Sequence, residues 1–276
     1  MFSSMKVIRL EDQEKFAVMQ KDYLRTLIAP MDGMWEGMTI ADSIVWKIQD
    51  QGRSAGFFCL DADGRLLRFF LSEDYQQNAY SIFSWVLSTY HVRSAFVSTM
   101  EAFFFSLCLD KQSRVKTHAY LFHHDLKVIE PSIDQSALCL KLAKESDLQD
   151  VVTFYERNAG GPGDWIEPFL HRRFERNELL LLYKEQMLVA AGECIPSQLQ
   201  PPYADMGMVV EESQRRQGLG SFMIMQLKKR CYEHHWKPIC SCEVINPASK
   251  RAIEKAGMLS EHRLVEVEFA SIDTPQ

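Results

Sequence analysis

The chain has 276 residues, of which 46% are hydrophobic and 25% are charged, and its formal net charge is −6. These values are ordinary for a soluble globular protein, so a real core is expected and wholesale disorder is excluded. The acidic balance argues against nucleic acid as the main partner, because neutralising phosphates requires clustered Lys and Arg.

The cysteines and the lengths of the hydrophobic runs indicate the cellular compartment in which the protein is expected. The chain has 7 cysteines, and most lie in apolar runs such as Phe57–Leu60, which is typical of reduced thiols that serve as small hydrophobic residues. Cys240 and Cys242 form a C-x-C, but no second Cys or His pair follows at zinc spacing, so no metal is expected. No apolar run approaches a membrane span, and residues 1–6 lack the pattern of a secretory signal. We therefore expect a cytoplasmic protein without a membrane or nucleic-acid partner.

The first half of the chain is predicted to alternate between strands and helices. A β-hairpin is the clearest local prediction: Ala55–Leu60 and Leu66–Leu71 flank Asp63-Gly64, and Asp-Gly supplies the positive φ that a tight turn requires. The other expected elements of this half are a strand at 5–11, a helix at 13–27, a loop at 31–40, a helix at 43–49, a helix at 78–89, a strand at 91–98, a helix at 100–109 and a strand at 115–123.

A polar segment with a proline, residues 130–136, is the best candidate for a linker. It divides the chain into an expected domain 1–130, a linker 131–136 and a second domain 137–276. The order of elements then repeats, which indicates an internal duplication, although two α/β halves can share an order by chance. The expected elements of the second half are strands at 137–143, 179–183, 187–195, 204–210, 239–244 and 264–269, and helices at 147–157, 166–176, 218–233 and 247–256.

The strongest local signal is the passage from the strand Met208–Val210, through Arg215 and Arg216, into Gly218-Leu219-Gly220, where a long helix is predicted to begin. Glycines let the backbone approach a ligand closely, and the first turn of a helix exposes unpaired N–H groups. Together with the arginines, these groups predict an anion site suited to pyrophosphate. The segment matches neither a Walker loop nor a Rossmann fingerprint, and an ordinary helix N-terminus with convenient glycines is the alternative interpretation.

Two linked segments resemble those of the GNAT superfamily of N-acyltransferases. Arg215-x-x-Gly218-x-Gly220 looks like motif A of this family, and the stretch from Asn246 to Met258 is similar to its N-x-x-S … E-K-x-G-F segment. The resemblance covers about residues 137–269. It implies tandem GNAT-like acyltransferase domains of the α/β class, in which the central strands of a mixed α+β sheet splay apart and helices flank the sheet.

The resemblance also implies acetyl-CoA as the cosubstrate, with pantetheine between the splayed strands and the pyrophosphate against the glycine loop. The implied reaction moves an acetyl group to a primary amine by direct attack in a ternary complex. The alternative is a non-catalytic acyl-CoA-binding or sensor protein, and an interaction protein on the same scaffold is a third reading. The expected cofactor-binding residues are Met208, Val209, Val210, Arg215, Arg216, Gln217, Gly218, Leu219, Gly220, Ser221, Asn246 and Ser249.

The catalytic groups are less clearly marked by the sequence. Many family members carry a tyrosine as general acid where this chain has Ile253, so Ser249 is the expected substitute, with a helix cap as its alternative role. Direct attack needs a base, because the amine must be neutral to react. A carboxylate in an apolar strand suits this role, since desolvation raises its pKa. Glu193 is the first candidate for the base, ahead of Asp205 and Glu243. For each of the three, the alternative interpretation is a strand-end or solvent-facing charge.

The N-terminal half lacks the phosphate loop, because the equivalent segment, Tyr75–Ser81, contains neither Gly nor Arg. Side chains there should obstruct the approach of pyrophosphate, so we expect this half not to bind coenzyme A. In the C-terminal half, the family resemblance implies that the glycine-rich segment Asn158–Trp165 shapes the acceptor pocket, with a flexible connector and a core tryptophan as the alternative. The sequence leaves the acceptor and the oligomeric state open, with a homodimer among the options.

Overall fold

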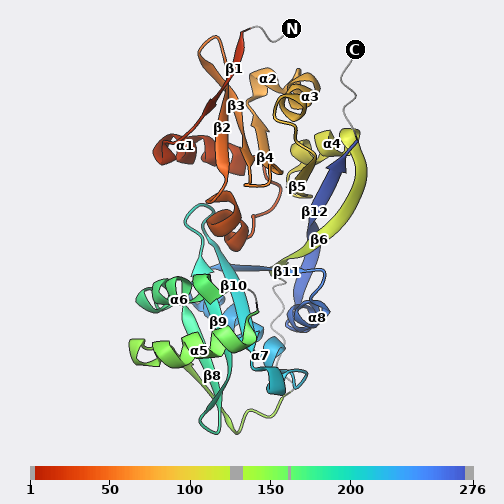
Figure 1. Ribbon diagram of the computed structural model, residues 1–276. Coiled ribbons are helices and arrows are strands. Elements are labelled where there is room, and N and C mark those ends of the chain that lie inside the picture. Colours follow the sequence, from red (N-terminus) through yellow and green to blue (C-terminus); the bar gives the residue numbers. More distant parts are fainter. Residues whose placement is uncertain (1–3, 125–132, 161–162, 271–276) are drawn as a thin grey trace. The chain divides into compact units, whose positions relative to one another are not determined.

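The computed structural model describes residues 4–124, 133–160 and 163–270 (Figure 1). The chain forms two compact units: unit 1 comprises Met1–Tyr120 with His262–Gln276, and unit 2 comprises Leu121–Glu261. Both units are mixed α/β, with strands of a mixed sheet flanked by helices, and this confirms the expected fold class. No helix within the described residues is both long and apolar enough to cross a membrane.

Unit 1 is built on strands in the order β1-β2-β3-β4-β5-β12, of which β1 to β4 are antiparallel neighbours and β5 is parallel to β4. Its elements are β1 (Met5–Arg9), α1 (Gln13–Leu24), the π-helix η1 (Trp35–Ile40), β2 (Ile44–Asp50), β3 (Arg53–Leu60), β4 (Leu66–Leu71), α2 (Glu73–Gln76), α3 (Ala79–Thr89), β5 (Ser94–Ser98), α4 (Ala102–Lys111), most of β6 (Gln112–His124) and the end of β12 (Met258–Phe269).

The core of unit 1 lies on both faces of β3. Alternate side chains of a strand point to opposite faces. Phe58 therefore packs with α3 and α4 through residues such as Phe83, whereas Phe57 packs with α1 through Phe16 and Tyr23. A strand that is buried on both faces reads as a continuous apolar run, as the central part of β3 does.

Two elements of unit 1 differ from the sequence-based expectation. The prediction of a helix at 43–49 is wrong, because this segment is strand β2. It pairs along its length with β3, from Ile44 opposite Leu60 to Asp50 opposite Arg53. β-branched Ile and Val fit such a pleated surface well. The loop expected at 31–40 contains the π-helix η1. The predicted hairpin is confirmed, with Gly64 at a φ of 77° in its turn.

Unit 2 places its strands in the order β11-β10-β9-β8-β7. Helices α5 and α6 pack on one face around Tyr155 and Leu170, and α7 packs on the other face, where Met223 and Leu227 lie against Gly192 of β9. The elements are β7 (Leu138–Leu142), η2 (Glu145–Asp147), α5 (Leu148–Asn158), η3 (Gly163–Trp165), α6 (Ile166–Glu175), β8 (Leu179–Lys184), β9 (Met187–Pro196), β10 (Tyr203–Val210), η4 (Glu212–Gln214), α7 (Leu219–Glu233), β11 (Lys237–Glu243), α8 (Pro247–Lys255) and the start of β12.

The compact units differ from the expected domains 1–130 and 137–276. The end of β12, from Leu264 to Glu268, pairs antiparallel with β5, and Val265, Val267 and Phe269 complete the core of unit 1. The last strand of the chain therefore belongs to the first unit. In the expected linker 131–136, residues 131 and 132 lie outside the described part of the chain.

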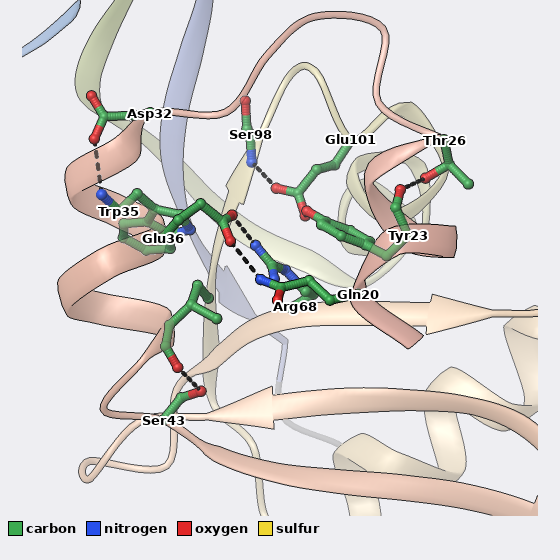
Figure 2. Close-up of polar contacts among 11 residues, drawn as sticks. Gln20, Tyr23, Thr26, Asp32, Trp35, Glu36, Ser43, Arg68, Ser98 and Glu101 are labelled. Carbon is green, nitrogen blue, oxygen red and sulfur yellow. Dashed lines mark hydrogen bonds and ion pairs between the residues drawn. The ribbon is translucent and has the colours of Figure 1, made fainter. Parts of the chain in front are cut away.

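A buried polar cluster lies beside β4 of unit 1 (Figure 2). Arg68 of β4 is fully buried and donates to Glu36 of η1, and the second carboxylate oxygen of Glu36 accepts from Gln20 at 2.8 Å. The Arg68 guanidinium also lies 4.1 Å from the ring centroid of Tyr23. Nε and Nη1 of Arg68 have no hydrogen-bond partner among the described residues.

Glu101, which directly precedes α4, is the second buried carboxyl group of this cluster (Figure 2). It accepts a hydrogen bond from the Tyr23 hydroxyl at 2.5 Å and another from the backbone N–H of Ser98 at 2.7 Å. Burial raises the pKa of Glu101 to about 7. The cluster therefore concentrates charged and polar groups in the interior of unit 1, on the face of β4 that α1 and η1 cover.

Candidate active site

The two central strands of unit 2 run parallel and then separate. Tyr203–Asp205 of β10 pair with Lys237–Ile239 of β11, and no pairing between these strands follows in the described chain. On its other edge β10 stays paired with β9 as far as Val210. Beyond Asp205, the edge of β10 that faces β11 therefore has no strand partner from β11, and backbone N–H and C=O groups on such an edge can bind another extended chain. The splayed sheet implied by the resemblance is present here.

The loop between β10 and α7 has the backbone conformation of an anion-binding turn. Arg216 and Gly218 lie in the left-handed region, at φ 65° and 88°, and Gly218 is the N-cap of α7. A left-handed N-cap favours glycine, since a side chain there would be strained. The first N–H groups of the 15-residue helix α7 follow directly. Such groups carry partial positive charge and suit a phosphate ligand.

A pocket of about 640 Å³ lies against β10, this loop and α8. It contains every residue expected to bind the cofactor except Gln217, which is exposed. Several lining residues were not expected to bind the cofactor. Asn158, Ala159 and Gly160 belong to the segment expected on the acceptor side, and Gln214 precedes the two arginines of the loop. The others lie in α8, where helical spacing is their only signal: Ala248, Arg251, Ala252 and Lys255.

Gly220 has a packing role besides its place in the motif. A Cβ atom at this position would lie 3.3 Å from the Cβ of Ala252 and 3.3 Å from the Cε of Met208. Contacts this short would push α7 away from α8 and from β10. Gly220 therefore allows the walls of the pocket to lie close together.

Glu193 of β9 is buried, at 7% exposure, and its environment suits a proton acceptor. It accepts a hydrogen bond from the Tyr155 hydroxyl at 3.0 Å. Burial raises its pKa, and the Tyr155 hydrogen bond only partly opposes this shift. Glu193 is not among the residues that line the pocket.

Gly207 of β10 leaves room for the Glu193 carboxylate. The two residues are register partners on β10 and β9, and a Cβ atom at Gly207 would lie 2.0 Å from Oε1 of Glu193. The carboxylate thus occupies the space that a side chain at position 207 would fill. Met208, the first residue of β10 that lines the pocket, follows directly in the chain.

Ser249 and Asn246 lie at the start of α8, on the wall opposite β10. The Oδ1 atom of Asn246 accepts a hydrogen bond from the Ser249 N–H at 3.0 Å, so Asn246 is the N-cap of the helix. Burial raises the pKa of Cys242, on the neighbouring strand β11, to about 11, and the Ser249 side chain only partly opposes this rise in pKa. Ile253, at the position of the usual tyrosine, is 2% exposed and belongs to the core.

The remaining sequence candidates lie elsewhere. Asp205 is buried at the point where β10 and β11 separate, and Glu243 is exposed at the end of β11. Trp165 is partly buried and packs edge-on against Phe169, with ring centroids 5.5 Å apart, at the margin of the core cluster around α5 and α6.

In unit 1 the corresponding strands also separate, since β4 pairs with β5 at Leu66 and Ala95. The helix that follows, α3, begins after Asn78 rather than a glycine, and Asn78 is not in the left-handed region. Arg68 lies on the separating strand β4 and Glu101 directly precedes α4, and both side chains are buried.

Known proteins share both the sequence patterns and the fold. An acetyltransferase (GNAT) domain matches residues 12–125, and the acetyltransferase (GNAT) family matches residues 146–258. The solved acetyltransferase from the GNAT family of Colwellia psychrerythraea is 31% identical, with a TM-score of 0.90 over 96% of this chain and 100% of that one.

Two further solved structures share the fold at lower identity. A GCN5-related N-acetyltransferase from Sphaerobacter thermophilus is 13% identical, with a TM-score of 0.65 over 99% of this chain and 98% of that one. A tandem GNAT protein from the clavulanic acid biosynthesis pathway is 13% identical, with a TM-score of 0.65 over 98% of this chain and 100% of that one. A search of curated proteins found no match. The chain therefore belongs to the GNAT family, as an acyltransferase with tandem GNAT domains and acetyl-CoA as the acyl donor of its family.

Proposed function

We propose that unit 2 transfers the acetyl group of acetyl-CoA to a primary amine by direct attack in a ternary complex. One observation carries this proposal: beyond Asp205, β10 leaves its parallel partner, and the free edge of Met208–Val210 forms a pocket wall that continues into the glycine loop. An extended pantetheine arm can pair with a free strand edge through its amides, as a peptide does in strand addition. The pyrophosphate then meets the N-terminus of α7.

Glu193 is the general base in this proposal. An ammonium group must lose a proton before its nitrogen can attack the thioester carbonyl carbon. Glu193 has a raised pKa, and its carboxylate lies over Gly207, next to the first pocket residue of β10. It would take the proton directly or through a water molecule. The new carbon–nitrogen bond and the existing carbon–sulfur bond then share a tetrahedral intermediate.

Ser249 is the proposed donor to the departing thiolate, in place of the tyrosine that Ile253 replaces. When the intermediate collapses, the carbon–sulfur bond breaks and the electron pair stays on sulfur. Ser249 lines the pocket at the start of α8, on the wall opposite β10. It can therefore donate a proton or a hydrogen bond to the leaving sulfur, with water restoring its own proton.

Unit 1 is proposed to hold no second acetyl-CoA. It lacks the left-handed glycine before α3, and the large buried side chains of Arg68 and Glu101 lie beside its separating strands. A buried arginine paired with Glu36 is costly to move, because an uncompensated charge would remain. We infer that unit 1 has a structural role and that the chain binds one acetyl-CoA.

The proposal is tested first by isothermal titration of acetyl-CoA into the wild type and a Gly218→Glu variant. One site per chain is expected in the wild type. Its loss is expected in the variant, because a side chain at a φ of 88° is strained, its Cβ atom would lie 2.7 Å from Cγ2 of Ile133, and the added carboxylate would repel the phosphates. Gly64→Glu is the matched control, since Gly64 has a similar φ of 77° in the hairpin of unit 1. Two sites per chain, or binding that survives in Gly218→Glu, contradicts the proposal.

Turnover is tested by release of the coenzyme A thiol from acetyl-CoA across a panel of primary amines, including small polyamines, amino acids and lysine peptides. Amine-dependent thiol release with formation of the acetylated amide supports the proposed reaction. Binding without release for every amine would leave the acceptor chemistry of this proposal without support and favour other nucleophiles.

A further inference from the structure

The guanidinium of Arg215 makes contacts that point away from a role as a phosphate ligand. Its Nε donates to the carbonyl oxygen of Val210 at 3.2 Å, and its Nη2 donates to the carbonyl oxygen of Asn158 at 3.0 Å. Val210 ends β10, and Asn158 ends α5. One side chain of the cofactor loop therefore connects the end of the pocket strand to the helix that precedes the expected acceptor segment.

A second contact joins the same two segments. The side-chain Oδ1 of Asn158 accepts from the backbone N–H of Glu212 at 2.9 Å, while its Nδ2 donates to the carbonyl oxygen of Phe154 at 2.8 Å. Asn158 thus uses its backbone and both side-chain polar atoms at this junction. We name the Arg215–Asn158 and Asn158–Glu212 hydrogen bonds together the clasp.

Arg216 differs from its neighbour. It also lines the pocket, but its backbone is in the left-handed region, and its side chain makes no hydrogen bond or ion pair with any residue that the structure describes. A flexible exposed guanidinium remains available for a phosphate, whereas one whose donors are used by carbonyl groups is already held in place.

We propose that Arg215 is a positioning residue, which holds Asn158–Gly160 against the cofactor loop, and that Arg216 is the arginine that pairs with pyrophosphate. This inference rests on the proposed function of the pocket and assigns different roles to two adjacent residues of one motif. Because Asn158–Gly160 also line the pocket, the clasp makes the end of α5 part of the cofactor wall. Acetyl-CoA that fixes the glycine loop also fixes the segment that leads to the acceptor side.

The test combines hydrogen exchange of the free protein with titration of acetyl-CoA at low and high salt. For Arg215→Gln we expect at least tenfold faster exchange at residues 158–160 and at the Glu212 amide, because the Asn158 carbonyl loses its donor and the Asn158 side chain that accepts from the Glu212 N–H is then held less firmly. We expect a Kd for acetyl-CoA within about threefold of wild type. For Arg216→Gln we expect unchanged exchange, a Kd at least about tenfold weaker, and a smaller dependence of Kd on salt, since an exposed charge pair is screened.

Two further variants separate positioning from general damage. Lys donates from one atom, so Arg215→Lys should restore only part of the wild-type protection. Asn158→Asp keeps an acceptor for the Glu212 N–H and should protect that amide, whereas Asn158→Ala should not. Exchange in β8 serves as the internal control for global stability and should stay constant in all variants.

Each outcome decides the roles of the two arginines. If Arg215→Gln weakens acetyl-CoA binding as much as Arg216→Gln while exchange at 158–160 stays constant, Arg215 is a phosphate ligand and the clasp is wrong. If the wild type binds no acetyl-CoA, the proposed function fails, but the exchange data on the free protein still decide whether the clasp exists.

Discussion

At the scale of single residues, two neighbouring residues and the surrounding core determine the position and the pKa of the Glu193 carboxylate. Tyr155 of α5 donates a hydrogen bond to it, Gly207 of β10 leaves space for it, and the surrounding core removes it from water. Burial favours the protonated form and raises the pKa, which makes the carboxylate a stronger base than an exposed one. The environment of Glu193 therefore fits the proposed role, whereas Glu243 is exposed.

Glu193→Gln is expected to lower kcat about 10²- to 10⁴-fold, in the range of a lost general base. In the wild type, kcat/KM should fall as the pH drops below the raised pKa of Glu193, because the protonated carboxyl group cannot accept a proton. That limb should disappear in the variant. The pH profile of kcat/KM checks this. Glu243→Gln, an exposed carboxylate at the end of β11, is the control and should retain wild-type activity.

Arg68 illustrates the opposite use of a buried charge, in which stability rather than chemistry is at stake. Arg68→Met is expected to destabilise unit 1 by about 3–5 kcal/mol, since Glu36 would be left buried without its cation. The double variant Arg68→Met with Glu36→Gln should recover part of this loss. Urea denaturation measures both, with Arg65→Met as the control, because the Arg65 side chain is 38% exposed and its ion pairs contribute about 1 kcal/mol or less. Equal effects of Arg65→Met and Arg68→Met would contradict this account.

At the scale of elements, the pocket depends on how α7 holds α8. Lys228 of α7 is 3% exposed, and its Nζ donates to the carbonyl oxygens of Ala256 at 3.0 Å and Gly257 at 3.3 Å. These carbonyls lie at the C-terminal end of α8, where the helix has unpaired acceptors and a partial negative charge. The cation therefore fixes the far end of the helix that forms one wall of the pocket.

Lys228→Met should destabilise the protein by about 1.5–3 kcal/mol, because buried carbonyl groups lose a charged donor. It should also weaken acetyl-CoA binding severalfold, since α8 can then shift relative to α7. Chemical denaturation and titration with acetyl-CoA are the measurements. The adjacent, exposed Lys229 provides the control, and Lys229→Met should change neither quantity. Weaker binding without loss of stability would argue for a direct contact of Lys228 with the cofactor.

At the scale of the whole molecule, unit 1 is not contiguous in sequence. Its β5 strand pairs with Leu264–Glu268 of β12, and Val265, Val267 and Phe269 are buried in its core. A fragment that ends at the expected linker would lack this strand. Unit 1 therefore requires the end of the chain in order to bury its apolar surface.

Deleting residues after Glu261 is expected to destabilise unit 1 by more than about 5 kcal/mol, given about 1.5–3 kcal/mol for each large buried side chain. The β5 edge would also be left unpaired, which favours aggregation. A fragment of residues 1–270 is the control and should melt like the full chain, because it keeps β12. Thermal denaturation followed by circular dichroism compares the two, and equal melting temperatures would refute the role of β12.

The sequence by itself determined the features that depend on neighbouring residues. The Asp-Gly hairpin, the long helix α7 after Gly218 and the helix expected from residue 247 all follow from local patterns, and the structure contains each of them. Local hydrogen bonds and backbone preferences act over a few residues, so their patterns can be recognised in the sequence without knowledge of the tertiary structure.

Only the tertiary structure decided which distant residues meet. The helix expected at 43–49 became β2 because pairing with β3 outweighed local preference, and β12 joined unit 1 because its partner β5 lies far away in sequence. Nor does any spacing in the sequence indicate that Gly207 leaves room for Glu193, or that Arg215 reaches Asn158. Such contacts join elements whose separation along the chain carries no periodic signal, and the free energy that selects them comes from burial and pairing in the folded chain.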